Sequence, residues 1–264
     1  MITVLGASGF IGSRLVKRLE ALGREHQAVR RDDPMPEGAL GHLVYAIGLT
    51  ADFRTRTFDT VEAHVCKLLD VLRHADFESL LYLSSTRVYS GSDSTHEESA
   101  VPVSPFDIYN ASKITGESLV LNCGRPGRVV RISNVYGDDF GSKNFLSTII
   151  KDALTKQKIV LQTSAESAKD YISVNNIVDG LIEIATRGKE RLYNLASGTN
   201  ISNNQLADML HRLTGSTVEY SHNAPSVIFP PINTDRLRAE FDLQTSYLLD
   251  DMPQLIESYR HDQS

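Results

Sequence analysis

The sequence has little of what marks secreted, membrane-spanning or nucleic-acid-binding proteins. Only two of its 264 residues are cysteine, Cys66 and Cys123, and they stand in unrelated contexts. This argues against a disulfide framework and against a spaced set of metal ligands, and it fits a reducing compartment. No apolar run reaches the roughly 20 residues that a membrane-spanning helix needs. With a net charge of -6, the chain has no basic excess for binding nucleic acid or anionic lipid.

Signals for export and for repetition are missing as well. The chain opens with the strand-like Ile2-Thr3-Val4-Leu5 and has no basic leader ahead of an apolar segment. It contains no internal repeat and no low-complexity tract. We therefore expect a cytoplasmic protein without a metal, a membrane partner or a nucleic-acid partner.

The residues that are present are typical of a soluble α/β protein. Hydrophobic residues make up 41% of the chain and charged residues 23%, which allows a substantial core. Strand-like runs occupy residues 2–5, 26–30, 43–47, 80–84 and 129–132, and helical patterns between them occupy residues 10–22, 58–72 and 108–121. This alternation predicts a Rossmann-like, doubly wound parallel sheet with helices on both faces. Pro34 and Pro36 predict an irregular link, rather than a helix, between the second and third strands.

The helical pattern over residues 58–72 predicts one continuous helix with an apolar stripe facing the core. The stripe comprises Phe58, Val61, Val65, Leu68, Leu69 and Leu72. Cys66 lies on the same stripe, so we expect it to be a core residue rather than a reactive thiol.

A glycine-rich turn joins the first strand to the first helix. The run Gly6-Ala7-Ser8-Gly9-Phe10-Ile11-Gly12 has glycine at every third position, a spacing different from the standard Gly-x-Gly-x-x-Gly fingerprint. Such a turn lets the backbone approach a pyrophosphate, which the N–H groups and dipole of the helix N-terminus stabilise. The residues expected to bind a dinucleotide cofactor are Gly6, Ser8, Gly9, Phe10, Ile11 and Gly12.

The end of the second strand bears on which cofactor binds. An acidic residue there would accept a hydrogen bond from the adenosine ribose, whereas an arginine would pair with a 2′-phosphate. The apolar pattern ends at Val29, and Arg30, Arg31, Asp32 and Asp33 follow, so both signs are present. Arg30 stands at the deciding position with Arg31 beside it, which favours NADP(H) and leaves NAD(H) possible.

A hydroxyl, a phenol and an amine occur at the end of the fourth strand and at the start of the helix that follows it. Ser85 closes the fourth strand, and Tyr109 and Lys113 begin the next helix four residues apart, on one face. Ligands bind at the carboxyl ends of parallel strands, so we expect these groups at the same crevice as the glycine turn. An ammonium group stabilises phenolate, and Lys113 is therefore expected to draw the pKa of Tyr109 from ~10 toward neutrality, where a general acid and base works best.

Together these motifs resemble the extended short-chain dehydrogenase/reductase family, and within it the NAD-dependent epimerase/dehydratase group that acts on nucleotide sugars. Four further segments extend the resemblance over most of the chain: Arg131-Ile132-Ser133-Asn134-Val135-Tyr136-Gly137, Asn144-Phe145, Lys169-Asp170-Tyr171-Ile172 and Tyr193-Asn194-Leu195-Ala196-Ser197-Gly198.

The resemblance implies a set of roles. Ser85 would hold the substrate oxygen, Tyr109 would handle the proton, and Lys113 would also bond the nicotinamide ribose. Ala46, Ile47 and Ser133 would line the cofactor site, and Thr86, Asn134, Asn144 and Lys169 would contact the nucleotide-sugar substrate. The family's usual homodimer would form through the helices around residues 61–72 and 108–121. His64 replaces an asparagine common in the family and is interpreted as structural.

Two departures from the family pattern reduce the number of reactions that the chain is expected to catalyse. Dehydratases carry Asp-Glu directly after the active-site hydroxyl, whereas Thr86-Arg87 stands there in this chain, which disfavours dehydration. Residues 216–235 contain no arginine for the substrate diphosphate. The favoured interpretation is an NADP(H)-dependent reductase of a 4-keto nucleotide sugar. A nucleotide-sugar 4-epimerase with tightly bound NAD and a non-catalytic NADP(H)-sensing regulator are the alternatives.

The domain organisation follows from these assignments. Beyond Gly137 helices are expected at residues 145–154, 177–185, 204–213 and 252–259, with short strands at 159–161 and 171–174. We expect residues 1–137, with 170–198 interleaved, to form a dinucleotide-binding domain. Residues 138–169 and 199–264 are expected to form a smaller substrate-binding lobe.

Overall fold

The computed structural model describes residues 1–50 and 52–262, and the chain divides into two compact units. The first unit comprises Met1–Ser133, Val174–Leu195 and Asn233–Leu243. The second comprises Asn134–Ser173, Ala196–Ile232 and, among the described residues, 244–262. Residues 134–137, 170–173 and 196–198 thus belong to the second unit, although the sequence placed them in the dinucleotide-binding domain. The segment Asn233–Leu243 belongs to the first unit, although the sequence placed it in the second lobe. It is held there because Asn194 Nδ2 donates to the Asn233 carbonyl at 2.9 Å.

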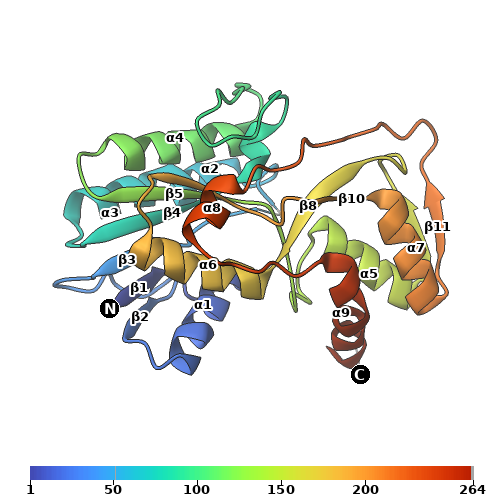
Figure 1. Ribbon diagram of the computed structural model, residues 1–264, viewed down its shortest axis with the longest axis horizontal. Helices are drawn as coiled ribbons and strands as arrows, with labels where there is room; N and C mark the ends of the chain where they lie inside the picture. Colours follow the sequence, from blue (N-terminus) through green and yellow to red (C-terminus); the bar gives the residue numbers. More distant parts are fainter. Residues whose placement is uncertain (51, 263–264) are drawn as a thin grey trace. The chain divides into compact units, whose positions relative to one another are not determined.

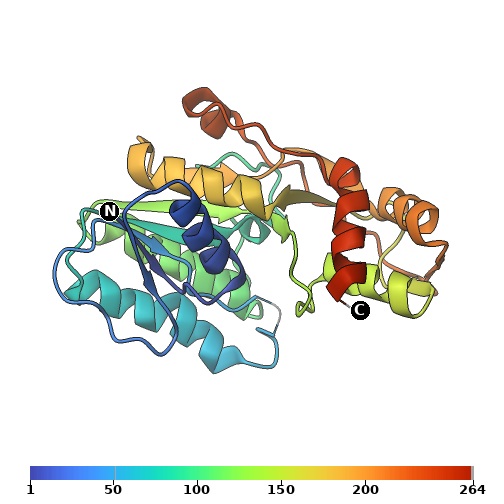
Figure 2. The same cartoon turned by 90° about the horizontal axis from the view of Figure 1, so that it is seen from below.

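The first unit is built on a six-stranded sheet in the order β2-β1-β3-β4-β5-β9, with every neighbouring pair parallel. Its strands are β1 (Ile2–Leu5), β2 (His26–Val29), β3 (His42–Tyr45), β4 (Ser79–Ser85), β5 (Gly127–Ile132) and β9 (Leu192–Leu195). Helices α1 (Phe10–Ala21) and α6 (Val174–Arg187) cover one face, and α4 (Ile108–Asn122) lies on the other (Figures 1 and 2). The expected Rossmann-like doubly wound sheet is confirmed, and its strand order reverses between β1 and β3, where ligands bind in such sheets.

The link between β2 and β3 contains no helix, as the two prolines predicted. β1 and the first six residues of β4 are fully buried, which explains why they read as continuous apolar runs rather than alternating patterns. β9 is the sixth strand of the sheet. The segment Asn233–Leu243, which also belongs to this unit, contains helix α8 (Asp235–Glu240).

The helix expected over residues 58–72 is interrupted. It consists of α2 (Thr57–Val61), a π-helical turn (Glu62–Cys66) and α3 (Lys67–His74). A π-helical turn inserts a residue and so rotates the side chains of α2 relative to those of α3. For this reason Leu68 and Leu72 are buried as expected, but Phe58 is 90% exposed. Cys66 is exposed as well, so its predicted core position is wrong.

The described residues of the second unit form two small sheets and three helices. The sheets are β10-β8-β6 and β11-β7, formed by β6 (Asn134–Tyr136), β7 (Lys158–Leu161), β8 (Ala168–Ser173), β10 (Asn200–Ser202) and β11 (Thr217–Tyr220). The helices are α5 (Phe145–Thr155), α7 (Asn203–Thr214) and α9 (Leu248–Asp262). α7 is bounded by local sequence: Ser202 and Gln205 form a capping box, and Gly215 ends the helix at φ 73°.

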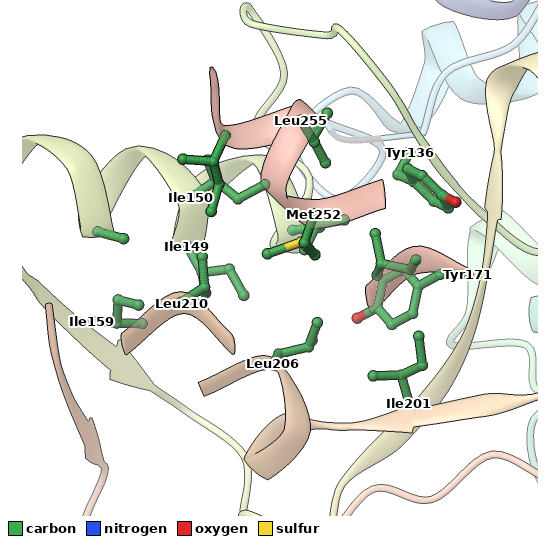
Figure 3. Close-up of a cluster of buried hydrophobic side chains, with 14 of the residues drawn as sticks. Tyr136, Ile149, Ile150, Ile159, Tyr171, Ile201, Leu206, Leu210, Met252 and Leu255 are labelled. Atoms are coloured by element: carbon green, nitrogen blue, oxygen red, sulfur yellow. The ribbon is translucent and has the colours of Figure 1, made fainter. Parts of the chain in front are cut away.

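An apolar cluster joins the helices and strands of the second unit. Figure 3 shows side chains from α5, α7 and α9 converging on Tyr136 and Tyr171 from β6 and β8. Ile150, Leu206 and Met252 in this cluster are completely buried. The cluster therefore fixes the strands that carry the predicted substrate-binding residues Asn134 and Lys169.

Within the described ranges, no helix combines the length and apolar character needed to cross a membrane. The same ranges contain no group of three or more histidine, cysteine, aspartate or glutamate side chains that could hold a metal ion.

Candidate active site

The glycine turn after β1 is packed too closely for side chains. Gly6 has φ +86°, and a Cβ atom there would lie 2.9 Å from the backbone of Ala46. A Cβ atom on Gly12 would lie 2.2 Å from the Gly6 carbonyl oxygen. These two glycines let α1 start directly at the sheet edge, in contact with the segment that follows β3.

The first turn of α1 is open to an anionic ligand. Gly9 is the N-cap and no side chain caps the helix, while Ser8 is exposed and Phe10 and Ile11 are half-buried. Uncapped N–H groups and the positive end of the helix dipole bind phosphate groups. The predicted residues of the glycine turn are thus brought together in an arrangement that fits a dinucleotide pyrophosphate.

The ends of β2 and β3 lie beside this turn. β2 ends at Val29, whose carbonyl accepts from the N–H groups of Gly6 and Ala7 at 3.0 Å each. Arg30 and Arg31 come immediately after Val29 and are exposed. Ala46 and Ile47 come directly after β3, and Ala46 donates its N–H to the Leu5 carbonyl at 2.9 Å. The arginines therefore stand where the second strand ends, as the apolar pattern predicted.

Ser133 follows β5 at the same edge of the sheet. It is 7% exposed, and its hydroxyl has no hydrogen-bond partner among the described residues. A buried polar group without a partner is costly and points to a missing ligand group. The Ser133 hydroxyl and the glycine turn are both structural features that fit a bound dinucleotide.

Ser85, Tyr109 and Lys113 gather at the carboxyl end of β4. Tyr109 hydrogen-bonds through its side chain with Ser85. Lys113, one helical turn further along α4, donates from Nζ to the Leu83 carbonyl at 2.8 Å. Both Tyr109 and Lys113 are only 4% exposed. Both side chains of α4 therefore lie against the last residues of β4, Tyr109 at Ser85 and Lys113 at Leu83.

Lys113 on α4 lies close to the segment that follows β3, which also contacts the glycine turn. A Cβ atom placed on Gly48, three residues after β3, would lie 3.6 Å from Lys113 Nζ. Ala46, two residues earlier, contacts the glycine turn at Gly6. The candidates from β1, β3 and α4 therefore line one continuous edge of the first unit.

The electrostatics of Tyr109 differ from the sequence-based expectation. Burial raises the pKa of Tyr109, while the hydrogen bond with Ser85 and the positive charge of Arg87 act in the opposite direction. Burial also lowers the pKa of Lys113 from 10.5 to about 7, opposed by the Glu117 carboxylate. The prediction that Lys113 draws the pKa of Tyr109 toward neutrality is wrong, because desolvation outweighs the neighbouring charges and Arg87 is the cation that acts on the phenol.

Thr86 and Arg87 begin a 3₁₀ turn after β4. Thr86 is 7% exposed, and the Ser85 hydroxyl caps the turn by accepting from the Arg87 N–H at 3.2 Å. The Arg87 guanidinium lies 5.4 Å from the Tyr109 ring centroid and 4.8 Å from that of Phe53. Sequence reasoning missed this contact between Arg87 and Phe53, since 33 residues separate them.

His64 lies at the centre of the π-helical turn and is completely buried. Its Nε2 accepts from the Leu49 N–H at 3.2 Å, and its Nδ1 lies 2.9 Å from the Ser112 hydroxyl. A neutral imidazole accepts at one nitrogen and donates at the other, so Nδ1 donates to Ser112. Ser112 in turn donates to the Tyr109 carbonyl at 3.0 Å. His64 thus links the segment after β3 to the helix turn that carries Tyr109.

The remaining predicted substrate residues belong to the second unit. Asn134 Nδ2 donates to the Asp170 carbonyl at 2.8 Å, next to Lys169. Lys169 Nζ lies 4.5 Å from the Phe145 ring centroid, adjacent to Asn144, the N-cap of α5. The structure therefore brings Asn134, Asn144 and Lys169 together within that unit.

Sequence reasoning assigned no role to Asp170, which organises the turn after β9. Its carboxylate accepts from the backbone N–H groups of Ser197, Gly198 and Thr199 at 3.1, 2.7 and 3.1 Å. The Ser197 hydroxyl adds a fourth bond at 2.8 Å. Asp170 thus fixes the strand that carries Lys169. The only sequence signal for this role was an acidic residue within the Lys-Asp-Tyr-Ile segment.

Comparison with known proteins places these features in a family. A sequence profile described as the NAD dependent epimerase/dehydratase family matches residues 39–196. The chain is 27% identical over 161 residues to the dTDP-glucose 4,6-dehydratase of Streptomyces griseus, covering 58% of this chain and 49% of that protein. It is 23% identical over 265 aligned positions to the putative UDP-glucose 4-epimerase of Methanocaldococcus jannaschii, covering 85% of this chain and 86% of that protein.

A solved structure shares the fold. MoeE5, in complex with UDP-glucose and NAD, superimposes with a TM-score of 0.84 at 23% identity, covering 100% of this chain and 99% of that chain. The profile match spans more than half of the chain and confirms the resemblance that the motifs indicated. It also supports the expectation of an enzyme of the short-chain dehydrogenase/reductase type. The chain belongs to the NAD dependent epimerase/dehydratase family.

Proposed function

We propose that this chain transfers hydride between a nicotinamide dinucleotide and C4 of a nucleotide-linked sugar. The observation that carries the proposal is that Tyr109 meets Ser85 and Lys113 meets Leu83 at the carboxyl end of β4, in the sheet whose edge holds the glycine turn. A phenol, a hydroxyl and an amine at that edge suit the interconversion of a secondary alcohol and a ketone.

In this proposal the side chains have separate roles. Tyr109 donates a proton to the oxygen at C4 during reduction and accepts it during oxidation. Ser85, already hydrogen-bonded with Tyr109, holds the same oxygen. Lys113 and Ser133 would contact the nicotinamide end of the cofactor, which supplies or accepts the hydride when bound. Asn134, Asn144 and Lys169 would bind the nucleotide and diphosphate of the substrate.

The first specific candidate is a reductase that consumes NADPH and acts on a 4-keto nucleotide sugar. It is favoured by Arg30, which stands directly after β2 and is exposed, where a 2′-phosphate would be recognised. Thr86 and Arg87 occupy the positions at which dehydratases of the family carry their acidic pair, and neither can replace an Asp-Glu pair as acid and base.

The second candidate is a 4-epimerase that keeps NAD bound and returns the hydride to the opposite face of C4. It is favoured by the putative UDP-glucose 4-epimerase that aligns with 85% of this chain, and by the NAD bound to MoeE5. Asp32 and Asp33, next to the two arginines, offer a carboxylate for an unphosphorylated ribose.

Purification followed by cofactor analysis distinguishes the two candidates. We would record the absorbance spectrum and mass of any cofactor released by denaturation, then titrate NADPH and NADH into the cofactor-free protein. Co-purified NAD favours the epimerase, and a protein that takes up NADPH more tightly than NADH favours the reductase. Binding of neither dinucleotide would contradict the proposed function as a whole.

Arg30→Ala tests the reductase reading at one residue. If Arg30 pairs with a 2′-phosphate, the variant loses roughly 10-fold or more of its NADPH affinity, because a charge-assisted bond is removed, while its NADH affinity changes little. Arg24→Ala, at an exposed arginine in the turn before β2, is the matched control. Equal losses for both cofactors would remove Arg30 from phosphate recognition.

A further inference from the structure

Two arginine side chains lie against the ring of Phe53, which itself contacts Tyr109. The Arg54 and Arg87 guanidinium groups lie 4.7 and 4.8 Å from the Phe53 ring centroid. The Phe53 ring itself lies 5.1 Å from the Tyr109 ring and is 7% exposed. A buried aromatic ring thus holds two cations in place by cation–π contacts next to the reacting phenol.

The carboxylates of this chain accept hydrogen bonds from only some of the N–H groups of Arg54 and Arg87. Arg87 Nη2 donates to Asp107 Oδ2 at 3.1 Å, and the other Asp107 oxygen accepts from the Asn110 N–H as the cap of α4. Nε and Nη1 of Arg87 have no hydrogen-bond partner among the described residues. Arg54 makes neither an ion pair nor a hydrogen bond within the same part of the chain. Guanidinium donors therefore remain for an external anion.

The position of these donors indicates which part of a substrate they would meet. Ser85 and Tyr109 are hydrogen-bonded where the substrate oxygen would bind, and the Arg87 guanidinium lies 5.4 Å from the same tyrosine ring. A group bound there belongs to the sugar ring, on a carbon close to the one that reacts. A guanidinium has no proton to exchange in that setting, but its planar donors match the two oxygens of a carboxylate.

We propose that Arg87 and Arg54 bind a carboxylate on the sugar, so that the substrate is a nucleotide-linked uronic acid. This inference rests on the proposed function and specifies its substrate class. Arg87 makes the closer contact because it is positioned by Asp107, by Phe53 and by its place directly after Ser85 and Thr86. Arg54 is exposed and closes over the anion from the other arginine-bearing segment.

Calorimetric titration of paired ligands tests the inference. UDP-glucuronic acid and UDP-glucose differ only in the carboxylate, and the corresponding dTDP pair covers the second nucleotide; all four are titrated into the NAD-loaded protein. We expect the unmodified protein to bind the uronic acid of its preferred pair more tightly. In Arg87→Gln, affinity for the uronic acid falls roughly 10-fold or more, while affinity for the neutral sugar changes less than about threefold.

Two further variants keep the result interpretable. Arg54→Gln, at an exposed position, should lower affinity for the uronic acid by a smaller factor. Arg56→Gln is the matched control, because Arg56 Nε is already bound to Asp59 at 2.7 Å. Equal losses for both sugars in Arg87→Gln, or no loss for either, would overturn the inference and leave the proposed function standing. Failure of all four ligands to bind would instead overturn the proposed function and this inference with it.

Discussion

Tyr109 combines near-complete burial with contacts to four side chains. Its ring lies against Phe53 and against the edge of His64, at centroid distances of 5.1 and 5.5 Å. Burial keeps the phenol protonated, and Ser85 and Arg87 limit that effect. A protonated phenol next to a hydroxyl is ready to donate to a ketone oxygen, which is the direction that a reductase requires.

Replacing Tyr109 with phenylalanine tests this role. We expect Tyr109→Phe to lower turnover by roughly 10²-fold or more, because the proton donor is lost while the ring packing is retained. Cofactor affinity, measured by fluorescence titration, should stay close to that of the unmodified protein. The control is Tyr171→Phe in the second unit, a buried tyrosine outside the proposed machinery. Turnover near the unmodified level in Tyr109→Phe would remove Tyr109 from the chemistry.

Lys113 shows what residue spacing predicts and what it leaves open. The separation of four residues placed it on the same face of α4 as Tyr109, because the helix period is fixed by the backbone. Its pKa near 7 arises instead from burial, with Nζ held by the Leu83 carbonyl from β4. No local pattern in residues 109–113 encodes that environment.

At the scale of elements, the π-helical turn Glu62–Cys66 is the most informative departure from regular structure. A π-helical turn leaves carbonyl groups without their usual helical partners. Here the Ala63 carbonyl accepts from the Tyr45 hydroxyl at 2.6 Å and the His64 carbonyl from the Tyr82 hydroxyl at 3.4 Å. The two tyrosines come from β3 and β4, so the turn is stabilised by the sheet, and it directs His64 toward Leu49 and Ser112.

The buried state of His64 predicts a dependence of stability on pH. Burial, reinforced by the charge of Lys113, lowers the pKa of His64 from 6.5 to about 2. Between these values the unfolded chain binds a proton that the folded chain does not. Stability is therefore lost as the pH falls below about 6.5, by about 2 kcal/mol between pH 7 and pH 5.

Urea unfolding of the unmodified protein and of His64→Asn at both pH values measures this contribution. The asparagine variant lacks the titrating ring, so its loss of stability on acidification should be smaller by that amount. His222→Asn, at an exposed histidine, serves as the control and should behave like the unmodified protein. Parallel pH profiles for His64→Asn and the unmodified protein would contradict a buried neutral imidazole.

At the scale of the whole molecule, an unpartnered apolar surface on the first unit bears on the predicted homodimer. Val65 and Leu69, four residues apart across the π-helical turn and α3, are both half-buried, and so is Ile114 on α4. Phe58 on α2 is 90% exposed. Apolar groups left in water on neighbouring helices are typical of a surface that a second copy covers. The dimer stays a prediction.

Light scattering coupled to size-exclusion chromatography tests whether the chain forms the predicted homodimer. We expect the unmodified chain to elute as a dimer and Leu69→Glu as a monomer, because a carboxylate would lose its hydration in the interface. Leu22→Glu introduces the same charge at a 45% exposed leucine after α1 and should leave the dimer intact. A monomeric unmodified chain would refute the prediction directly.

The sequence by itself determined the parallel sheet, the glycine turn and the placement of Tyr109 and Lys113 one turn apart on α4. These features depend on periodicity and on glycine at close approaches, which are properties of neighbouring residues. Only the tertiary structure decided the raised pKa of Tyr109, the interruption that directs His64 inward, and the meeting of Arg87 with Phe53. Each of these depends on burial or on contact between segments far apart in the chain, and such contacts exist only once the sheet has assembled.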